Sequence, residues 1–143
     1  MGVRFDDSLV AKALRAMVSP PQGTRLADLI IKNDAKSRIK AFRLLSHLDT
    51  FEPHAVRPTP PYQVFDNVMT LARAHGLADE VHVVSEIADV NRSVLSLAEI
   101  SDVMTGDGRV SLAVIQPTLA VYQGESFQST RLLHVAVGRF RRE

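Results

Sequence analysis

The sequence contains no cysteine among its 143 residues. It therefore has no disulfide framework, no thiolate metal site and no catalytic thiol. It also lacks an excess of either charge, because 17 Lys and Arg stand against 16 Asp and Glu. The resulting net charge of +1 creates no strong overall field for an anionic partner, so any charge-driven binding must come from a local cluster.

A long apolar run is also lacking. The longest stretch without a charged residue, 110–124, contains several polar residues and is shorter than the roughly 20 apolar residues of a membrane-spanning helix. Asp6 and Asp7 stand where a signal peptide would have an apolar segment. The sequence therefore predicts an intracellular, soluble protein without a transmembrane segment.

Sequence signatures of common enzymes are missing as well. The segment Gly106-Asp107-Gly108 has neither the third glycine nor the following Lys-Ser/Thr of a phosphate-binding loop. There is no Gly-x-Ser-x-Gly elbow and no His-Glu-x-x-His pair. These absences predict no cofactor and no metal site, and they favour a protein that is not an enzyme.

What is present is the composition of one globular domain, with 45% hydrophobic and 23% charged residues. A proline-rich connection at 53–62 separates a helical part, 1–52, from a sheet-rich part, 63–143. All four lysines lie in the helical part. We expect residues 1–143 to form a single compact domain in which the two parts pack together.

Capping residues and apolar spacing predict three helices in the first part. Asp7 or Ser8 begins the first helix, and Thr24 begins the second. Asp34 begins a third helix that runs to about Leu48. The apolar stripe expected on this third helix consists of Ile39, Phe42, Leu45 and Leu48.

The second part contains β-branched, alternating segments that predict strands. The expected strands are 81–87, 109–115, 118–122 and 131–137, with a short helix that begins at the capping box Ser96 to Glu99. In the first of these strands, His82 and its neighbours on the same face are expected to meet solvent. The predicted fold class is α+β, with a helical N-terminal half packed on a mostly antiparallel C-terminal sheet.

The third helix carries a cationic stripe. Lys36, Lys40, Arg43 and His47 follow one another at steps of four, three and four residues, which places them on one helical face. Lys32 joins them if the helix continues backward without a break, as would Arg25. Residues 24–48 also have the outline of a helix-turn-helix: a short helix, a polar turn and a longer basic helix.

Two interpretations of this stripe remain open. It can dock a polyanion, most plausibly nucleic acid, through phosphate contacts, in which case the binding residues are Lys32, Lys36, Lys40, Arg43 and His47. It can equally be the solvated face of an amphipathic surface helix. An anionic membrane surface presents the same phosphate chemistry as nucleic acid, so the stripe does not distinguish the two.

Two alternative functions come from other parts of the chain. Strands that are apolar on both faces suggest a self-associating structural or scaffold subunit, and hence a homo-oligomer. A small enzyme is the other alternative, with a site near His82 and Glu86 or at His134. A histidine with nearby carboxylates can hold a divalent metal, although the same pattern is common on a solvated strand face.

Overall fold

The computed structural model describes residues 4–48, 50–57, 59–104, 110–124 and 130–134. Its elements follow one another in the order α1 (Asp7–Met17), α2 (Gln22–Lys32), α3 (Ala35–Ser46), β1 (Val56–Arg57), the 3-10 helix η1 (Pro61–Gln63), α4 (Val64–Ala74), β2 (Val81–Ser85), β3 (Ser93–Leu95), α5 (Leu97–Met104), β4 (Ser111–Gln116), β5 (Leu119–Gln123) and β6 (Arg131–His134). The predicted α+β class is confirmed, with most helices in the N-terminal half and the sheet in the C-terminal half.

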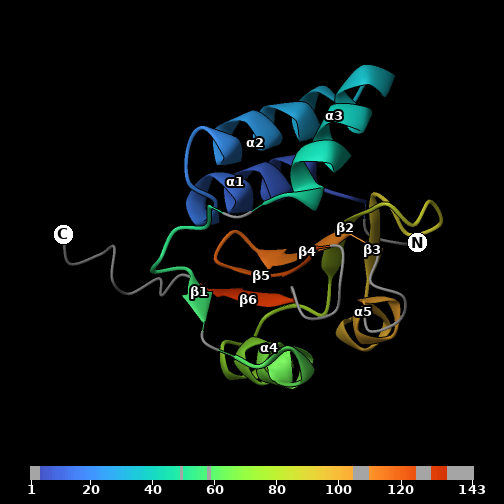
Figure 1. Ribbon diagram of the computed structural model, residues 1–143. Helices are drawn as coiled ribbons and strands as arrows, with labels where there is room; N and C mark the ends of the chain where they lie inside the picture. Colours follow the sequence, from blue (N-terminus) through green and yellow to red (C-terminus); the bar gives the residue numbers. More distant parts are fainter. Residues whose placement is uncertain (1–3, 49, 58, 105–109, 125–129, 135–143) are drawn as a thin grey trace.

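The strands form a six-stranded antiparallel sheet in the order β1-β6-β5-β4-β2-β3. Helices α1, α2 and α3 lie on one side of this sheet, and α4 and α5 lie on the other side (Figure 1). The protein is thus three layers deep. None of its described helices is both long and apolar enough to cross a membrane.

This layering explains why β4 shows so little polar alternation. Leu112 and Val114 point into the core beneath α1–α3, whereas Ala113 and Ile115 point into the core beneath α4 and α5. A strand that is covered on both faces has no solvated side on which polar residues are needed. The apolar character of the strands is therefore accounted for by the two helical layers, without a second copy of the chain.

The proline-rich segment does more than connect the two parts. Its residues Val56 and Arg57 pair with β6 and form one outer strand of the sheet, which the sequence did not indicate. The opposite outer strand, Ser93–Leu95, was also not predicted. Both outer strands are short, which leaves little free edge for pairing with another chain.

Several predicted boundaries need correction. The cap of α1 is Asp6, whose side chain accepts a hydrogen bond from the N–H of Leu9, and α2 begins at Gln22 rather than at Thr24. The capping box of α5 is present, with Ser96 and Glu99 bonded reciprocally. The predicted strand residues at 109 and beyond His134 lie outside the described residues.

The start of α2 packs closely against the C-terminal end of α1 and the residue that follows it. A Cβ atom added at Gly23 would lie only 2.2 Å from the carbonyl oxygen of Val18 and 2.9 Å from that of Leu14. Glycine is needed at this position because the backbone of α1 occupies the space of a side chain. This crossing sets where α2 lies, and through α2 the position of α3.

Candidate cationic face on α3

A two-residue turn separates α2 from α3 and makes the segment a helix–turn–helix of two distinct helices. Asn33 ends α2 in the left-handed conformation, with φ of 51°, and its N–H donates to the carbonyl of Leu29. Asp34 begins α3, because its carboxylate accepts a 2.7 Å hydrogen bond from the N–H of Ser37. The predicted cap of the third helix is therefore confirmed. The sequence left open whether this segment is one helix or two; it is two, so Lys32 belongs to α2 and not to the helical stripe of α3.

The side of α3 that packs inward combines two small residues with two large apolar ones. Ser37, Ala41 and Leu45 are buried, and Phe42 is partly buried beside them. The hydroxyl of Tyr122 on β5 donates a 2.5 Å hydrogen bond to the carbonyl of Leu45, which ties the C-terminal end of α3 to the sheet. With the helix fixed in this rotation, its opposite face must point to solvent.

The expected apolar stripe on α3 is wrong at Ile39, which is 61% exposed. Small side chains at Ser37 and Ala41 let the rest of the domain approach α3 on that side, so the buried face is rotated away from Ile39. Ile39 consequently lies on the outward face together with the cations. Ile31 of α2 is also exposed, at 44%.

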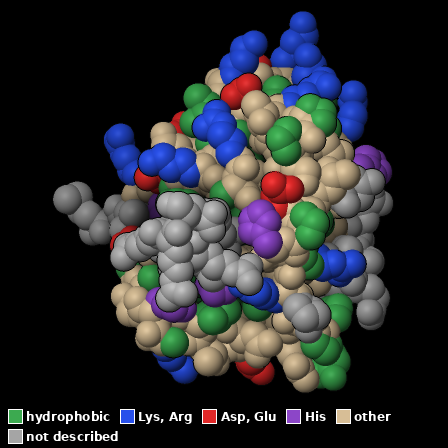
Figure 2. Space-filling model, turned by 90° about the vertical axis from the view of Figure 1, so that its left-hand side faces the viewer, with side chains coloured by type: hydrophobic (Ala, Val, Ile, Leu, Met, Phe, Trp, Pro, Cys, Tyr) green, Lys and Arg blue, Asp and Glu red, His purple; other side chains and the backbone are tan. Residues whose placement is uncertain are grey.

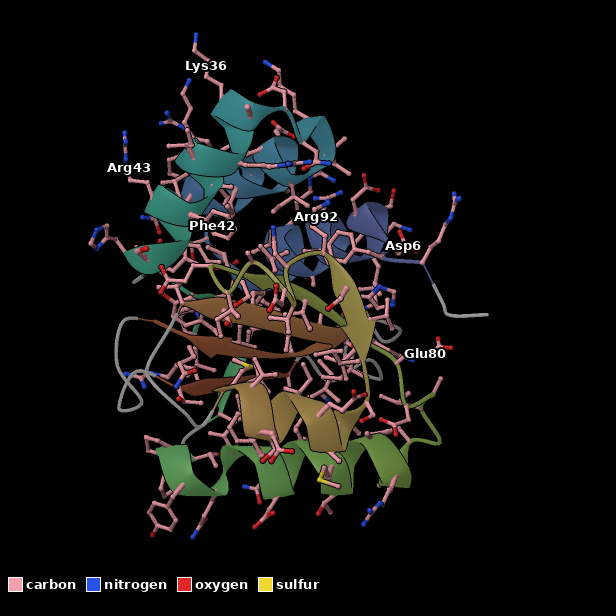
Figure 3. The ribbon with its side chains drawn as sticks, turned by 90° about the vertical axis from the view of Figure 1, so that its right-hand side faces the viewer. Asp6, Lys36, Phe42, Arg43, Glu80 and Arg92 are labelled. Atoms are coloured by element: carbon pink, nitrogen blue, oxygen red, sulfur yellow. The ribbon has the colours of Figure 1, made fainter. Side chains whose placement is uncertain are left out.

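The outward face carries the residues that the sequence singled out. Lys36, Lys40 and Arg43 are exposed along α3, His47 is exposed at its C-terminal end, and Lys32 is exposed as the last residue of α2. Figure 3 shows Lys36 and Arg43 pointing away from the body of the protein. In Figure 2, Lys and Arg side chains gather mainly at the end of the molecule that the helical layer forms.

We call the residues Lys32, Lys36, Lys40, Arg43 and His47 the cationic face. Between described residues, no ion pair involves Lys32, Lys36, Lys40 or Arg43. A nearby carboxylate, Asp34, is committed to capping α3. Its pKa is lowered mainly by the hydrogen bonds from Ser37, and the charges of Lys32 and Lys40 lower it further. Lys32, Lys36, Lys40 and Arg43 therefore present positive charges that no ion pair with another described residue neutralises.

The second predicted site, around His82, differs from the expectation. His82 is only 5% exposed, because α1–α3 cover the strand face that was expected to meet solvent. Its Nδ1 accepts a hydrogen bond from the N–H of Asp6, and the ring of Phe5 lies beside it. Burial lowers the pKa of His82, and the charges of Asp6 and Glu80 partly oppose this effect.

The carboxylates expected near His82 do not join it. Glu86 accepts a hydrogen bond from the N–H of Val110 instead. Glu80 is the residue before β2, and its side chain points outward (Figure 3). In the part of the chain that the structure describes, no three His, Asp or Glu side chains are grouped as metal ligands. His134 is partly buried, with its ring 6.0 Å from that of His75. Burial lowers its pKa, as do the charges of Arg57 and His75.

Arg92 is a residue that the sequence did not single out. It adopts the left-handed conformation, with φ of 59°, in the connection between β2 and β3. Its guanidinium lies over the ring of Phe5 at 4.5 Å and approaches Asp7 at 3.8 Å. These contacts join segments far apart in the sequence, so no local sequence pattern indicates them.

Comparisons with known proteins add no functional information. No protein-family model, no curated protein and no solved structure gives a match to this chain. Function must be argued from the residues themselves.

Proposed function

We propose that this protein binds nucleic acid through the cationic face, with lysine and arginine side chains of α3 contacting backbone phosphates. The observation that carries the proposal is the outward projection of Lys36, Lys40 and Arg43 from one helix, without ion pairs to the described remainder of the chain. Release of counterions from the phosphate backbone would supply the driving force.

The position of α3 in the fold supports this proposal. Its C-terminal end is fixed to the sheet through Tyr122, while its N-terminal half stands above the sheet (Figure 1). An α-helix with side chains is about 10–12 Å wide, which matches the major groove of B-DNA at about 12 Å. A helix that projects from a rigid base can therefore enter a groove or lie along a phosphate backbone.

The residue types on the face favour phosphate contacts over base recognition. Adenine is commonly recognised by Asn or Gln side chains, and α3 contains neither. Lysine binds phosphate as a flexible point charge and carries little geometric preference. We therefore expect similar affinity for duplexes of different sequence.

The test is charge reversal on the face with a matched control elsewhere. The variant Lys36→Glu/Arg43→Glu alters two cations of the cationic face. The control Lys12→Glu/Arg73→Glu alters two exposed cations on α1 and α4 and leaves the same net charge. Binding of labelled duplexes of several sequences is followed by fluorescence anisotropy at low salt.

We expect the face variant to lose affinity for every duplex by at least about tenfold, and the control to lose much less. Circular dichroism would establish that both variants are folded. Equal affinity of the two variants would refute the proposal, because it would show that only total charge matters. Binding that is absent in the wild-type protein even at low salt would refute it as well.

A further inference from the structure

A crevice lies on the inner side of the helix–turn–helix, away from the cationic face. It is lined by apolar residues of α2, α3 and β2, and by four polar residues from two parts of the chain. The α2–α3 segment contributes Asn33 and Arg38, and the connection between β2 and β3 contributes Asn91 and Arg92. Figure 3 shows Phe42 and Arg92 between the helical layer and the sheet, whereas Lys36 points outward.

The hydrogen bonds around the crevice fix how both asparagine side chains are oriented. The Oδ1 atom of Asn33 accepts a 2.8 Å hydrogen bond from Nε of Arg38, and Oδ1 of Asn91 accepts a 3.0 Å hydrogen bond from the N–H of Ser85. In the opposite orientation each NH2 group would face another donor. The NH2 groups of both side chains can therefore donate hydrogen bonds to a ligand.

The guanidinium of Arg92 is held in place before any ligand arrives. It stacks over Phe5, its Nη1 lies 3.5 Å from the carbonyl oxygen of Ile30, and its Nη2 lies 3.8 Å from Asp7. Its side chain is 22% exposed, so the group reaches solvent only in part. A preorganised guanidinium loses little conformational entropy when it binds an anion.

The charges around the crevice are only partly balanced, because Arg92 has Asp7 as an ion-pair partner and Arg38 has no such partner among the described residues. Burial lowers the pKa of Arg92, the carboxylate of Asp7 opposes this effect, and the nearby charge of Arg38 lowers the pKa further. Two arginines thus face the same space, and no Asp or Glu is among the residues that line it. Like charges that share a partly desolvated space are stabilised by an anion placed between them.

From this arrangement we infer a second binding site, in which Arg38, Arg92 and the NH2 groups of Asn33 and Asn91 bind one oxyanion of the phosphate type. The crevice has a cavity volume of about 10 Å³, which is roughly the space of one water molecule. Only one or two oxygens of the anion can enter, and the rest of the ligand must remain outside. Such a site suits a terminal phosphate, carried by a small molecule or by the end of a nucleic acid strand.

The probe for this site is inorganic phosphate, titrated at constant ionic strength while backbone and side-chain amide signals are followed by NMR. We expect saturable shifts at Asn33, Asn91 and Arg92. The variant Arg38→Gln should weaken the phosphate Kd at least about tenfold, because it removes one of two charged donors. The matched control Arg73→Gln removes the same charge from an exposed position on α4, on the other side of the sheet, and should leave the Kd within about twofold.

A second variant tests the other guanidinium, with circular dichroism to establish that both variants are folded. Arg92→Asn removes the guanidinium and keeps a residue that tolerates the left-handed conformation, so it should weaken phosphate binding as Arg38→Gln does. Shifts that do not saturate, or that are the same in Arg38→Gln and the wild-type protein, would overturn the inference. Equal losses in Arg38→Gln and Arg73→Gln would overturn it too, because they would show nonspecific attraction.

The source of the phosphate is identified by comparing a 5′-phosphorylated strand with the same strand bearing a 5′-hydroxyl. A preference for the phosphorylated strand that disappears in Arg38→Gln supports the site and assigns the phosphate to a nucleic acid end. Saturable binding of inorganic phosphate without such a preference supports the site and assigns it to a small molecule. The proposed phosphate site in the crevice and the proposed nucleic-acid contacts of the cationic face can fail separately. Arg38→Gln tests the crevice, and Lys36→Glu/Arg43→Glu tests the cationic face.

Discussion

Replacing Gly23 with alanine tests how closely the helical layer is packed. A gain in helix propensity and a steric overlap change the free energy of unfolding in opposite directions. Alanine is the better helix former and would stabilise α2 by about 1 kcal/mol. Its Cβ would, however, lie 2.2 Å from a backbone oxygen of Val18, where ordinary contact begins at 3.4 Å. The opposing atoms are backbone oxygens, of Leu14 in α1 and of Val18 just after it, so no side chain can rotate away.

Relief of this overlap requires α1 and α2 to move apart by about 1.2 Å at their crossing. Overpacking of this kind costs typically 1–3 kcal/mol, and a clash with backbone belongs at the upper end of that range. After the gain in helix propensity, we expect Gly23→Ala to lower the free energy of unfolding by about 2 kcal/mol. For a domain of this size, that corresponds to a decrease in Tm of roughly 4–8 °C.

The assay is urea unfolding followed by circular dichroism, with Thr24→Ala as the control. Thr24 is the next residue of α2 and is exposed, so its replacement increases helix propensity without a steric conflict. We expect the control to be as stable as the wild-type protein or slightly more stable. If Gly23→Ala also matched or exceeded the wild-type stability, the described crossing of α1 and α2 would be refuted.

Two further predictions concern the contacts that hold the helical layer on the sheet. Tyr122→Phe removes the hydroxyl that donates to the Leu45 carbonyl, so the free energy of unfolding should decrease by about 1–2 kcal/mol in urea titrations; an unchanged value would contradict this anchor. The pKa of His82 is lower in the folded protein than the usual value near 6.5, so the unfolded chain binds more protons as pH decreases. The part of the free energy of unfolding that this pKa difference contributes is fully present above pH of about 6.5. It is lost as pH decreases toward the pKa of His82 in the folded protein. Unfolding measured between pH 8 and pH 5 should therefore depend on pH less steeply in His82→Gln than in the wild-type protein, and parallel curves would contradict the assignment.

Local signals in the sequence predicted the local features of the fold. Asp34 was identifiable as a cap because capping involves only a residue and the backbone three positions later. The alternation of 81–87 predicted a strand, and β2 occupies its first five residues. The antiparallel sheet followed from closely spaced strands with short connections.

Features that depend on packing between distant segments were not predictable. The exposure of Ile39 follows from the small residues Ser37 and Ala41, which decide the rotation of α3. The burial of His82 follows from a helical layer contributed by the other end of the chain. The crevice joins Asn33 and Arg38 to Asn91 and Arg92, and nothing in either segment indicates the other.

The salt dependence of duplex binding tests the central claim most directly. Each phosphate contact contributes a slope of about −0.9 to log K against log salt concentration, so contacts from Lys36, Lys40 and Arg43 predict a slope of about −3. In Lys36→Glu/Arg43→Glu the slope should become shallower by about two, whereas Lys12→Glu/Arg73→Glu should leave it unchanged. The same slope in the wild-type protein and in both variants would contradict the assignment of phosphate binding to α3.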